Sequence, residues 1–393
     1  ADRRRQQGRD PQAHPRPRAG RHRRPRHLVG NAGSSRGERS HRHHVRRTHH
    51  EHPRRRRSRR GCTHRGEHQQ RPGCRRRVRH RHGIPSRRVA SLMQQSRTAF
   101  LGLGRMGAAM ASRLVQLGAS LVVWNRSSGK AGAFAEEHGT AARLASTPRQ
   151  AAQDADRVVS MMANDEAALD VHLGTDGTLH ADPAPSLVIE CGTLSPDTVR
   201  TLARAAARRG IAFLDAPVSG SVDAARSGTL LFLVGGPDAA VEQGHILLDR
   251  MGRRVVHVGE TGRGALAKLL VNHVLHALNQ ATSEALALAR AEGLDVPAFY
   301  DALADSAAGA PMLGYRRSQY LGDEADVAFA LRLAAKDVRL VLQAAHAAGT
   351  PASQMRCNLE QLEAAIDAGH GDDDMAALAT FLAGTTVRTE GAS

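Results

Sequence analysis

The chain has 393 residues, which is enough for more than one domain, because a single hydrophobic core rarely grows beyond roughly 250–300 residues. Its formal net charge of +18 is unevenly distributed. Residues 1–97 contain 31 Arg and 13 His, five acidic residues and no Phe, Trp, Tyr or Lys, whereas the rest of the chain has 25 basic and 33 acidic side chains. This excludes a uniformly basic protein and indicates a mildly acidic body after a basic extension.

The basic extension, residues 1–97, is predicted to be disordered, because so few large apolar side chains cannot offset the conformational entropy lost on folding. Three interpretations of it stay open. We favour a start-site artefact, since the composition resembles GC-rich DNA translated in an unselected frame and Met93 precedes the first expected strand. The others are an incidental segment and a polyanion binder. Without aromatic residues for base stacking, nucleic acid would be held only non-specifically.

Other functional classes are disfavoured by what the sequence lacks. No run approaches the roughly 18 apolar residues of a membrane span, and we find no apolar secretion segment, so we expect a cytoplasmic protein. The four cysteines do not have the spacing of a zinc module, and we expect free thiols and no metal. They are Cys62, Cys74, Cys191 and Cys357.

A dinucleotide-binding unit is expected at the start of the body. Thr98–Gly102 and Leu121–Trp124 are short apolar runs, and Met106–Leu117 between them has apolar residues at helical spacing. The first run leads into Gly102-Leu103-Gly104-Arg105-Met106-Gly107, a G-x-G-x-x-G motif between strand and helix. Its glycines allow a tight turn and a close approach of pyrophosphate to the helix N-terminus. We therefore expect these six residues to bind NAD or NADP.

The choice of cofactor is predicted from Asn125-Arg126-Ser127, which follows the second strand. NAD sites usually place an acidic residue at this point, where it accepts hydrogen bonds from the adenosine ribose. The guanidinium of Arg126 suits a 2′-phosphate instead, so we expect NADP to be preferred over NAD. The alternative is a solvated arginine in a turn.

The remaining elements divide the body in two. Strands are expected at 157–162, 186–190, 212–214, 229–234 and 254–258, and they alternate with helical patterns such as 196–209 and 239–251. This alternation predicts an α/β fold, a Rossmann-type doubly wound and mostly parallel sheet over 98–260. Helical patterns at 263–291, 296–304, 331–348 and 352–368 predict an all-helical domain over 261–393, with the active site between the two domains.

Four blocks, in this order, resemble the β-hydroxyacid (3-hydroxyisobutyrate) dehydrogenase family over residues 98–385. They are Phe100–Gly107, Asp215–Gly220 with its continuation to Gly236, Gly262–Asn272, and Lys336-Asp337. The resemblance implies that Lys268 is the acid/base residue, that Ser219 and Gly220 hold a substrate carboxylate, and that Asn272 orients the substrate. It also implies cofactor contacts from Met162, Ala163, Thr193 and Lys336. Glu190-Cys191-Gly192 departs from the family, which often has an Asp-Ser run there.

The chemistry of alcohol oxidation supports Lys268 independently. Hydride transfer from an alcohol needs a base for the hydroxyl proton, and a lysine serves if its pKa is lowered toward neutrality. Lys268 and Asn272 are four residues apart and thus share one helix face. Only Lys130, Lys268 and Lys336 are lysines among the body's 25 basic residues. The alternative to a catalytic role is that Lys268 and Asn272 belong to a solvent-exposed polar face of the helix.

We therefore expect an NADP(H)-linked enzyme that interconverts a short 3-hydroxy acid and its semialdehyde, such as 3-hydroxyisobutyrate or tartronate semialdehyde. An imine reductase is the nearest alternative, although that class generally lacks the lysine. A catalytically silent module with a nucleic-acid-binding tail is the alternative from another class. Apolar residues on 263–291 lead us to expect a homodimer or homotetramer.

Overall fold

The computed structural model describes residues 97–322 and 326–385. Our expectations for the basic extension therefore concern residues that, apart from Arg97, lie outside the described part of the chain. Within that part, no helix is both long enough and apolar enough to cross a membrane.

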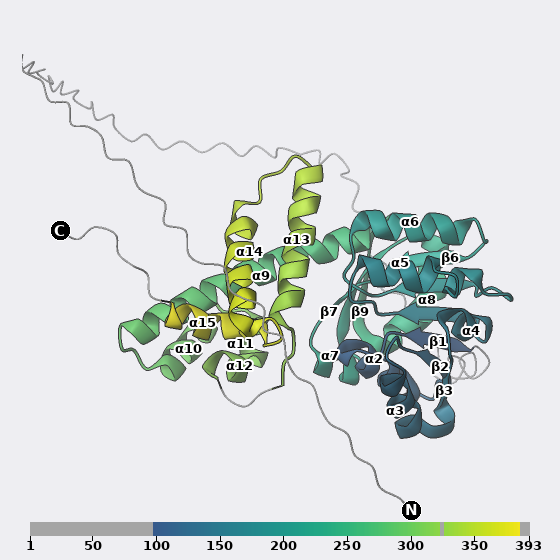
Figure 1. The fold of residues 1–393 in the computed structure, drawn as a ribbon, viewed down its shortest axis with the longest axis horizontal. Coiled ribbons are helices and arrows are strands. Elements are labelled where there is room, and N and C mark those ends of the chain that lie inside the picture. Colours follow the sequence, from purple (N-terminus) through teal and green to yellow (C-terminus); the bar gives the residue numbers. More distant parts are fainter. Residues whose placement is uncertain (1–96, 323–325, 386–393) are drawn as a thin grey trace, which may run out of the picture. The chain divides into compact units, whose positions relative to one another are not determined.

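A single sheet organises the first part of the described chain (Figure 1). Six parallel strands lie in the spatial order β3-β2-β1-β4-β5-β6. They are β1 (Thr98–Leu101), β2 (Leu121–Trp124), β3 (Ala142–Leu144), β4 (Arg157–Ser160), β5 (Leu187–Glu190) and β6 (Ala212–Asp215). This is the Rossmann order, and it places a topological switch point between β1 and β4, outside which such sheets bind their ligands. The predicted fold class is confirmed.

Three further strands extend the sheet beyond β6. They are β7 (Val218–Ser219), β8 (Leu230–Gly235) and β9 (Gly252–Gly259). Strand β8 is antiparallel to both β6 and β7 and parallel to β9. The sheet is therefore mostly parallel, and its antiparallel part carries the segment that contains Ser219.

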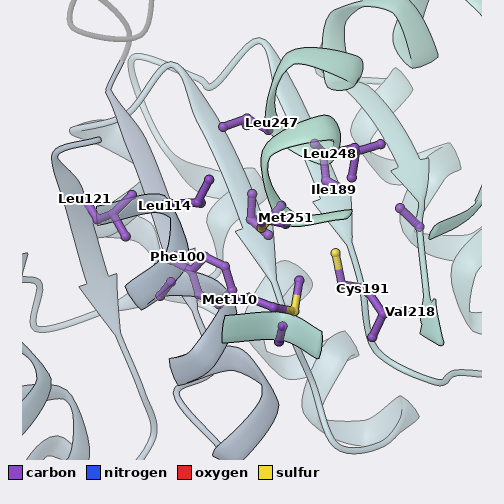
Figure 2. Close-up of a cluster of buried hydrophobic side chains, with 14 of the residues drawn as sticks. Phe100, Met110, Leu114, Leu121, Ile189, Cys191, Val218, Leu247, Leu248 and Met251 are labelled. Atoms are coloured by element: carbon purple, nitrogen blue, oxygen red, sulfur yellow. The ribbon is translucent and has the colours of Figure 1, made fainter. Parts of the chain in front are cut away.

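Helices cover both faces of the sheet because its strands are apolar on both sides, as buried parallel strands require. Along β1, Phe100 contributes to one hydrophobic cluster, while Ala99 and Leu101 contribute to the other. Figure 2 shows the first cluster, where Met110 and Leu114 meet the strands. Its helices are α2 (Arg105–Gln116), α3 (Ser128–His138), α7 (Val222–Ser227) and α8 (Asp238–Met251); the second cluster has α4 (Pro148–Gln153), α5 (Asp165–Leu173) and α6 (Pro196–Ala207).

The rest of the described chain is helical and packs around one long helix, α9 (Arg263–Ala291), as Figure 1 shows. A third hydrophobic cluster joins α9 to the helices that follow it. These are α10 (Val296–Asp305), α11 (Pro311–Tyr315), α12 (Arg317–Leu321), α13 (Leu331–Ala347), α14 (Ser353–Ala365) and α15 (Leu378–Gly384). Short 3₁₀ turns lie at Gly139–Ala141, Thr178–His180 and Met375–Ala377, and a π turn at Ile366–His370.

Candidate active site

The glycine-rich loop after β1 packs tightly against the end of β4. Gly102 has φ +91°, a conformation that L side chains rarely adopt, and a Cβ there would collide with the carbonyl oxygen of Met161. A Cβ at Gly107 would collide with the carbonyl oxygen of Gly102. These contacts hold helix α2 close to the switch point of the sheet.

The middle of the same loop is open, and its geometry fits a dinucleotide. A Cβ added at Gly104 would meet nothing within 4 Å. Helix α2 begins at Arg105 without a side-chain cap and without an acidic residue in its first turn. The N–H groups of this first turn therefore face a space that suits a diphosphate, because a helix N-terminus attracts anions. Leu103, Arg105 and Met106 lie in this loop and helix start as expected.

Asn125 holds the glycine-rich loop from the end of β2. Its Oδ1 accepts a hydrogen bond from the Leu103 N–H at 2.9 Å, and its Nδ2 donates to the Ser127 carbonyl at 3.1 Å. The amide thus supports the loop, in addition to the cofactor contact expected from the sequence. Arg126 and Ser127 are exposed beside it.

A chain of contacts joins the end of β5 to α9 through α13. The Lys336 ammonium donates a hydrogen bond to the Thr193 carbonyl at 2.7 Å, and it lies 2.8 Å from Oδ1 of Asp337. The other oxygen of Asp337 accepts a hydrogen bond from Nδ2 of Asn272 at 2.6 Å. Asp337 and Asn272 are 1% and 2% exposed. Three residues predicted from the sequence are therefore linked, and the buried Asp337 carboxylate connects two of them.

Lys268 lies one helical turn before Asn272 on α9. The pKa of the Lys268 amine is lowered to about 8, mainly by burial; the Asp337 carboxylate opposes this shift and the positive charge of Lys336 adds to it. A pKa near 8 lets one amine take up and release a proton close to neutral pH, which is what acid–base catalysis in both directions needs.

The predicted substrate loop begins where β7 ends. Ser219 is partly buried and Gly220 is exposed, and Ser219 lies opposite Leu231 of β8. No hydrogen bond or ion pair among the described residues links Ser219 or Gly220 to Lys268 or Asn272. Met162 is buried and Ala163 exposed in the loop after β4.

Asp215 is a residue whose role we did not predict, although it stands in one of the four sequence blocks. Its carboxylate accepts hydrogen bonds from the backbone N–H groups of Gly262 at 3.0 Å and Ala265 at 2.8 Å. Burial raises the pKa of Asp215, while these backbone hydrogen bonds oppose the rise. The carboxylate caps α9 from the end of β6, as a capping side chain does within one chain segment.

His276 was also missed. It follows Lys268 and Asn272 at the same four-residue spacing, is 2% exposed, and neither ring nitrogen has a hydrogen-bond partner. Its ring stacks on Phe329 with centroids 6.1 Å apart. Burial lowers the pKa of His276 to about 4. The four-residue spacing of Lys268, Asn272 and His276 is the signal in the sequence from which the position of His276 could have been predicted.

Comparison with known proteins matches the described chain to two family models. Residues 97–259 match the NAD-binding domain of 6-phosphogluconate dehydrogenase, and residues 262–382 match the NAD-binding domain of NADP-dependent 3-hydroxyisobutyrate dehydrogenase.

Individual relatives agree with these models. A 3-hydroxyisobutyrate dehydrogenase of Pseudomonas aeruginosa is 36% identical over 71% of this chain and 96% of its own length. An NAD-dependent L-serine dehydrogenase of the same organism is also 36% identical, over 67% of this chain and 91% of its own length. The solved structure of Mycobacterium tuberculosis 3-hydroxyisobutyrate dehydrogenase with L-serine is 29% identical, covers 73% of this chain and 99% of that one, and has a TM-score of 0.63.

Proposed function

The chain belongs to the β-hydroxyacid dehydrogenase family of NAD(P)-dependent oxidoreductases that act on CH–OH groups, and from this premise we propose that it interconverts a short 3-hydroxy acid and its semialdehyde. The membership confirms the resemblance drawn from the four sequence blocks. The observation that carries the proposal is the position of Lys268 one turn before Asn272 on α9, next to the Asn272–Asp337–Lys336 contacts, and its lowered pKa of about 8 fits this position.

In this proposal each residue has one task. Lys268 takes the proton from the substrate hydroxyl during oxidation and returns it to the carbonyl oxygen during reduction. Asn272 orients the substrate, and the buried Asp337 fixes the Asn272 amide. Ser219 and Gly220 hold the carboxylate. When bound, NAD(P) supplies the acceptor or donor of the hydride.

Lys336 and the glycine-rich loop keep the cofactor side of the site in place. Lys336 holds the Thr193 carbonyl at 2.7 Å, which fixes the segment after β5 against α13. The open space at Gly104 and the uncapped start of α2 take the diphosphate. Arg126 favours NADP, because its exposed guanidinium follows β2, where a 2′-phosphate would lie.

The substrate class is proposed from chemistry that two relatives share. 3-Hydroxyisobutyrate and L-serine, the compounds after which these two relatives are named, each carry a hydroxyl on the second carbon from the carboxylate group. A carboxylate anchor and one lysine at a fixed separation would select this arrangement. Assembly into a homodimer or homotetramer is also proposed, since Leu270, Val274 and Leu288 of α9 are 57%, 66% and 62% exposed.

The proposal is tested by replacing Lys268 and assaying a panel of short hydroxy acids and semialdehydes with both cofactors. We expect Lys268→Ala to lower kcat by roughly 10²–10⁴-fold with cofactor binding retained. Lys268→Arg should not restore activity, because a guanidinium stays protonated. Arg208→Ala, which removes an exposed cation after α6, is the control and should leave kcat unchanged. Retained activity in both Lys268 variants would refute the role of the amine.

A further inference from the structure

A buried carboxylate lies beneath the proposed cofactor site and takes no part in the function described so far. Glu190 ends β5 and lies opposite Ser160, which ends β4. Its Oε2 accepts a hydrogen bond from the Ser160 hydroxyl at 2.5 Å and lies 3.3 Å from Nε2 of His172. Nδ1 of His172 lies 2.6 Å from the Thr178 hydroxyl. All four residues are at most 1% exposed.

These four groups form a connected hydrogen-bond network around the Glu190 side chain. Nε2 of His172 lies 3.3 Å from Oε2 of Glu190 and 3.1 Å from the Ser160 hydroxyl, and Nδ1 faces Thr178, while Ser160 donates to the same Glu190 oxygen. A buried polar side chain costs free energy unless it is hydrogen-bonded, and this network supplies the partners of Glu190. The cluster therefore fixes the position of Glu190 from below the ends of the strands.

The other carboxylate oxygen faces the loops where we place the cofactor contacts. Oε1 of Glu190 accepts a hydrogen bond from the Gly192 N–H at 2.7 Å and a longer one from the Met162 N–H at 3.4 Å. Gly192 precedes Thr193, whose carbonyl receives Lys336. One carboxylate thus joins the loop after β4, the loop after β5 and, through Thr193, the lysine of α13.

The Glu190 carboxylate is one of the groups that sterically exclude a side chain at position 192. A Cβ at position 192 would lie 2.6 Å from Oε1 of Glu190 and 2.5 Å from the Met162 carbonyl oxygen. The carboxylate therefore occupies part of the volume that a side chain at 192 would need. The Glu190 carboxylate and the Met162 carbonyl oxygen are thus both physical reasons for a glycine at position 192.

We propose that Glu190 is a positioning residue for cofactor binding, and that Gly192 is required because the Glu190 carboxylate and the Met162 carbonyl oxygen together fill the space beside it. This inference rests on the proposed function in one respect, namely that the cofactor binds against Met162 and Thr193. Shortening the side chain should withdraw the acceptor from the Gly192 N–H and loosen both loops. Adding a side chain at 192 should displace the same loops from the opposite side.

A double-mutant cycle with Glu190→Asp and Gly192→Ser tests the proposal. Each single change should raise the dissociation constant of NADPH about tenfold, because small displacements at a binding site are costly. In the Glu190→Asp background, Gly192→Ser should raise the dissociation constant by a smaller factor than it does in the native protein, since the shorter acid removes one of the two obstacles while the Met162 carbonyl oxygen remains. Binding is read from nicotinamide fluorescence without substrate, so the result does not depend on the hydroxy acid or on Lys268.

Two controls separate positioning from folding. Glu166→Asp and Gly132→Ser make the same chemical changes at an exposed residue of α5 and at an open position of α3, and both should leave cofactor affinity unchanged. The melting temperature of every variant is measured alongside. Strictly additive effects of the two changes would overturn the coupling. A folded Glu190→Asp variant with unaltered cofactor affinity would reduce Glu190 to a structural residue.

Discussion

Acidification should destabilise the protein through His276, because its imidazole is buried without a hydrogen-bond partner. The folded-state pKa is about 4, against 6.5 for an unperturbed histidine; Asp337 opposes the shift, and Lys268, Arg316 and Lys336 add to it. Between these values the unfolded chain binds the proton and the folded chain does not. The free energy of unfolding therefore falls as pH falls from 6.5 to 4. The full effect is about 3 kcal/mol, of which about 2 kcal/mol appears between pH 8 and pH 5.

The measurement is urea unfolding followed by circular dichroism at several pH values between 8 and 5. Other groups also titrate in this range, so the informative quantity is the difference in pH dependence between the native protein and His276→Gln, which cannot be protonated. Between pH 8 and pH 5, we expect the free energy of unfolding of His276→Gln to fall by about 2 kcal/mol less than that of the native protein. His346→Gln, at an exposed histidine of α13, should behave like the native protein. Equal losses in the native protein and His276→Gln would refute the reasoning.

Three further predictions concern the cofactor site and the amine. For hydroxy-acid oxidation, kcat/KM should rise with pH and level off above the pKa of Lys268, about 8, because the base must be unprotonated. For semialdehyde reduction, kcat/KM should fall over the same pH range. A kcat/KM that does not change with pH in either direction would contradict the role of the amine. Arg126→Asp should weaken NADP(H) use by at least about tenfold, or roughly 1.4 kcal/mol, and spare NAD(H), as measured by kcat/KM with each cofactor; an equal loss with both would show that Arg126 does not bind the 2′-phosphate. Gly107→Ala should lower the free energy of unfolding by about 1–3 kcal/mol, because its methyl group meets the Gly102 carbonyl; urea unfolding tests this, with Gly132→Ala, which meets open space, as the control.

The long and strongly patterned elements of the fold were predictable from the sequence. Helix α9 was expected at 263–291 and has these bounds, and β1 and β2 were expected from apolar runs that the structure buries. Strands β3 and β7 were missed, since they have only three and two residues. Such short segments have no periodicity of their own and become strands only because a neighbouring strand offers its backbone hydrogen bonds.

The candidate site was predictable where its residues lie close together in the chain. The four-residue spacing of Lys268 and Asn272 placed both on one helix face. The hydrogen bond from Lys336 to Thr193 joins residues 143 positions apart, and no local pattern reports such a contact. Glu190 was noticed only as a departure from the family, because its partners Ser160 and His172 come from β4 and α5.

The cap that Asp215 places on α9 has a consequence for insertions and deletions. Two backbone N–H groups at the helix start are held by one carboxylate at the end of β6, so the rotation of α9 about its own axis is set from the sheet. Each helical residue turns the chain by about 100° and advances it by about 1.5 Å. One residue inserted between Ala265 and Lys268 would thus point the amine to a different side of the helix while leaving the cap intact. The segment between cap and lysine therefore behaves as a spacer of fixed length, tolerant of changed side chains on its outer face and intolerant of any change in residue number.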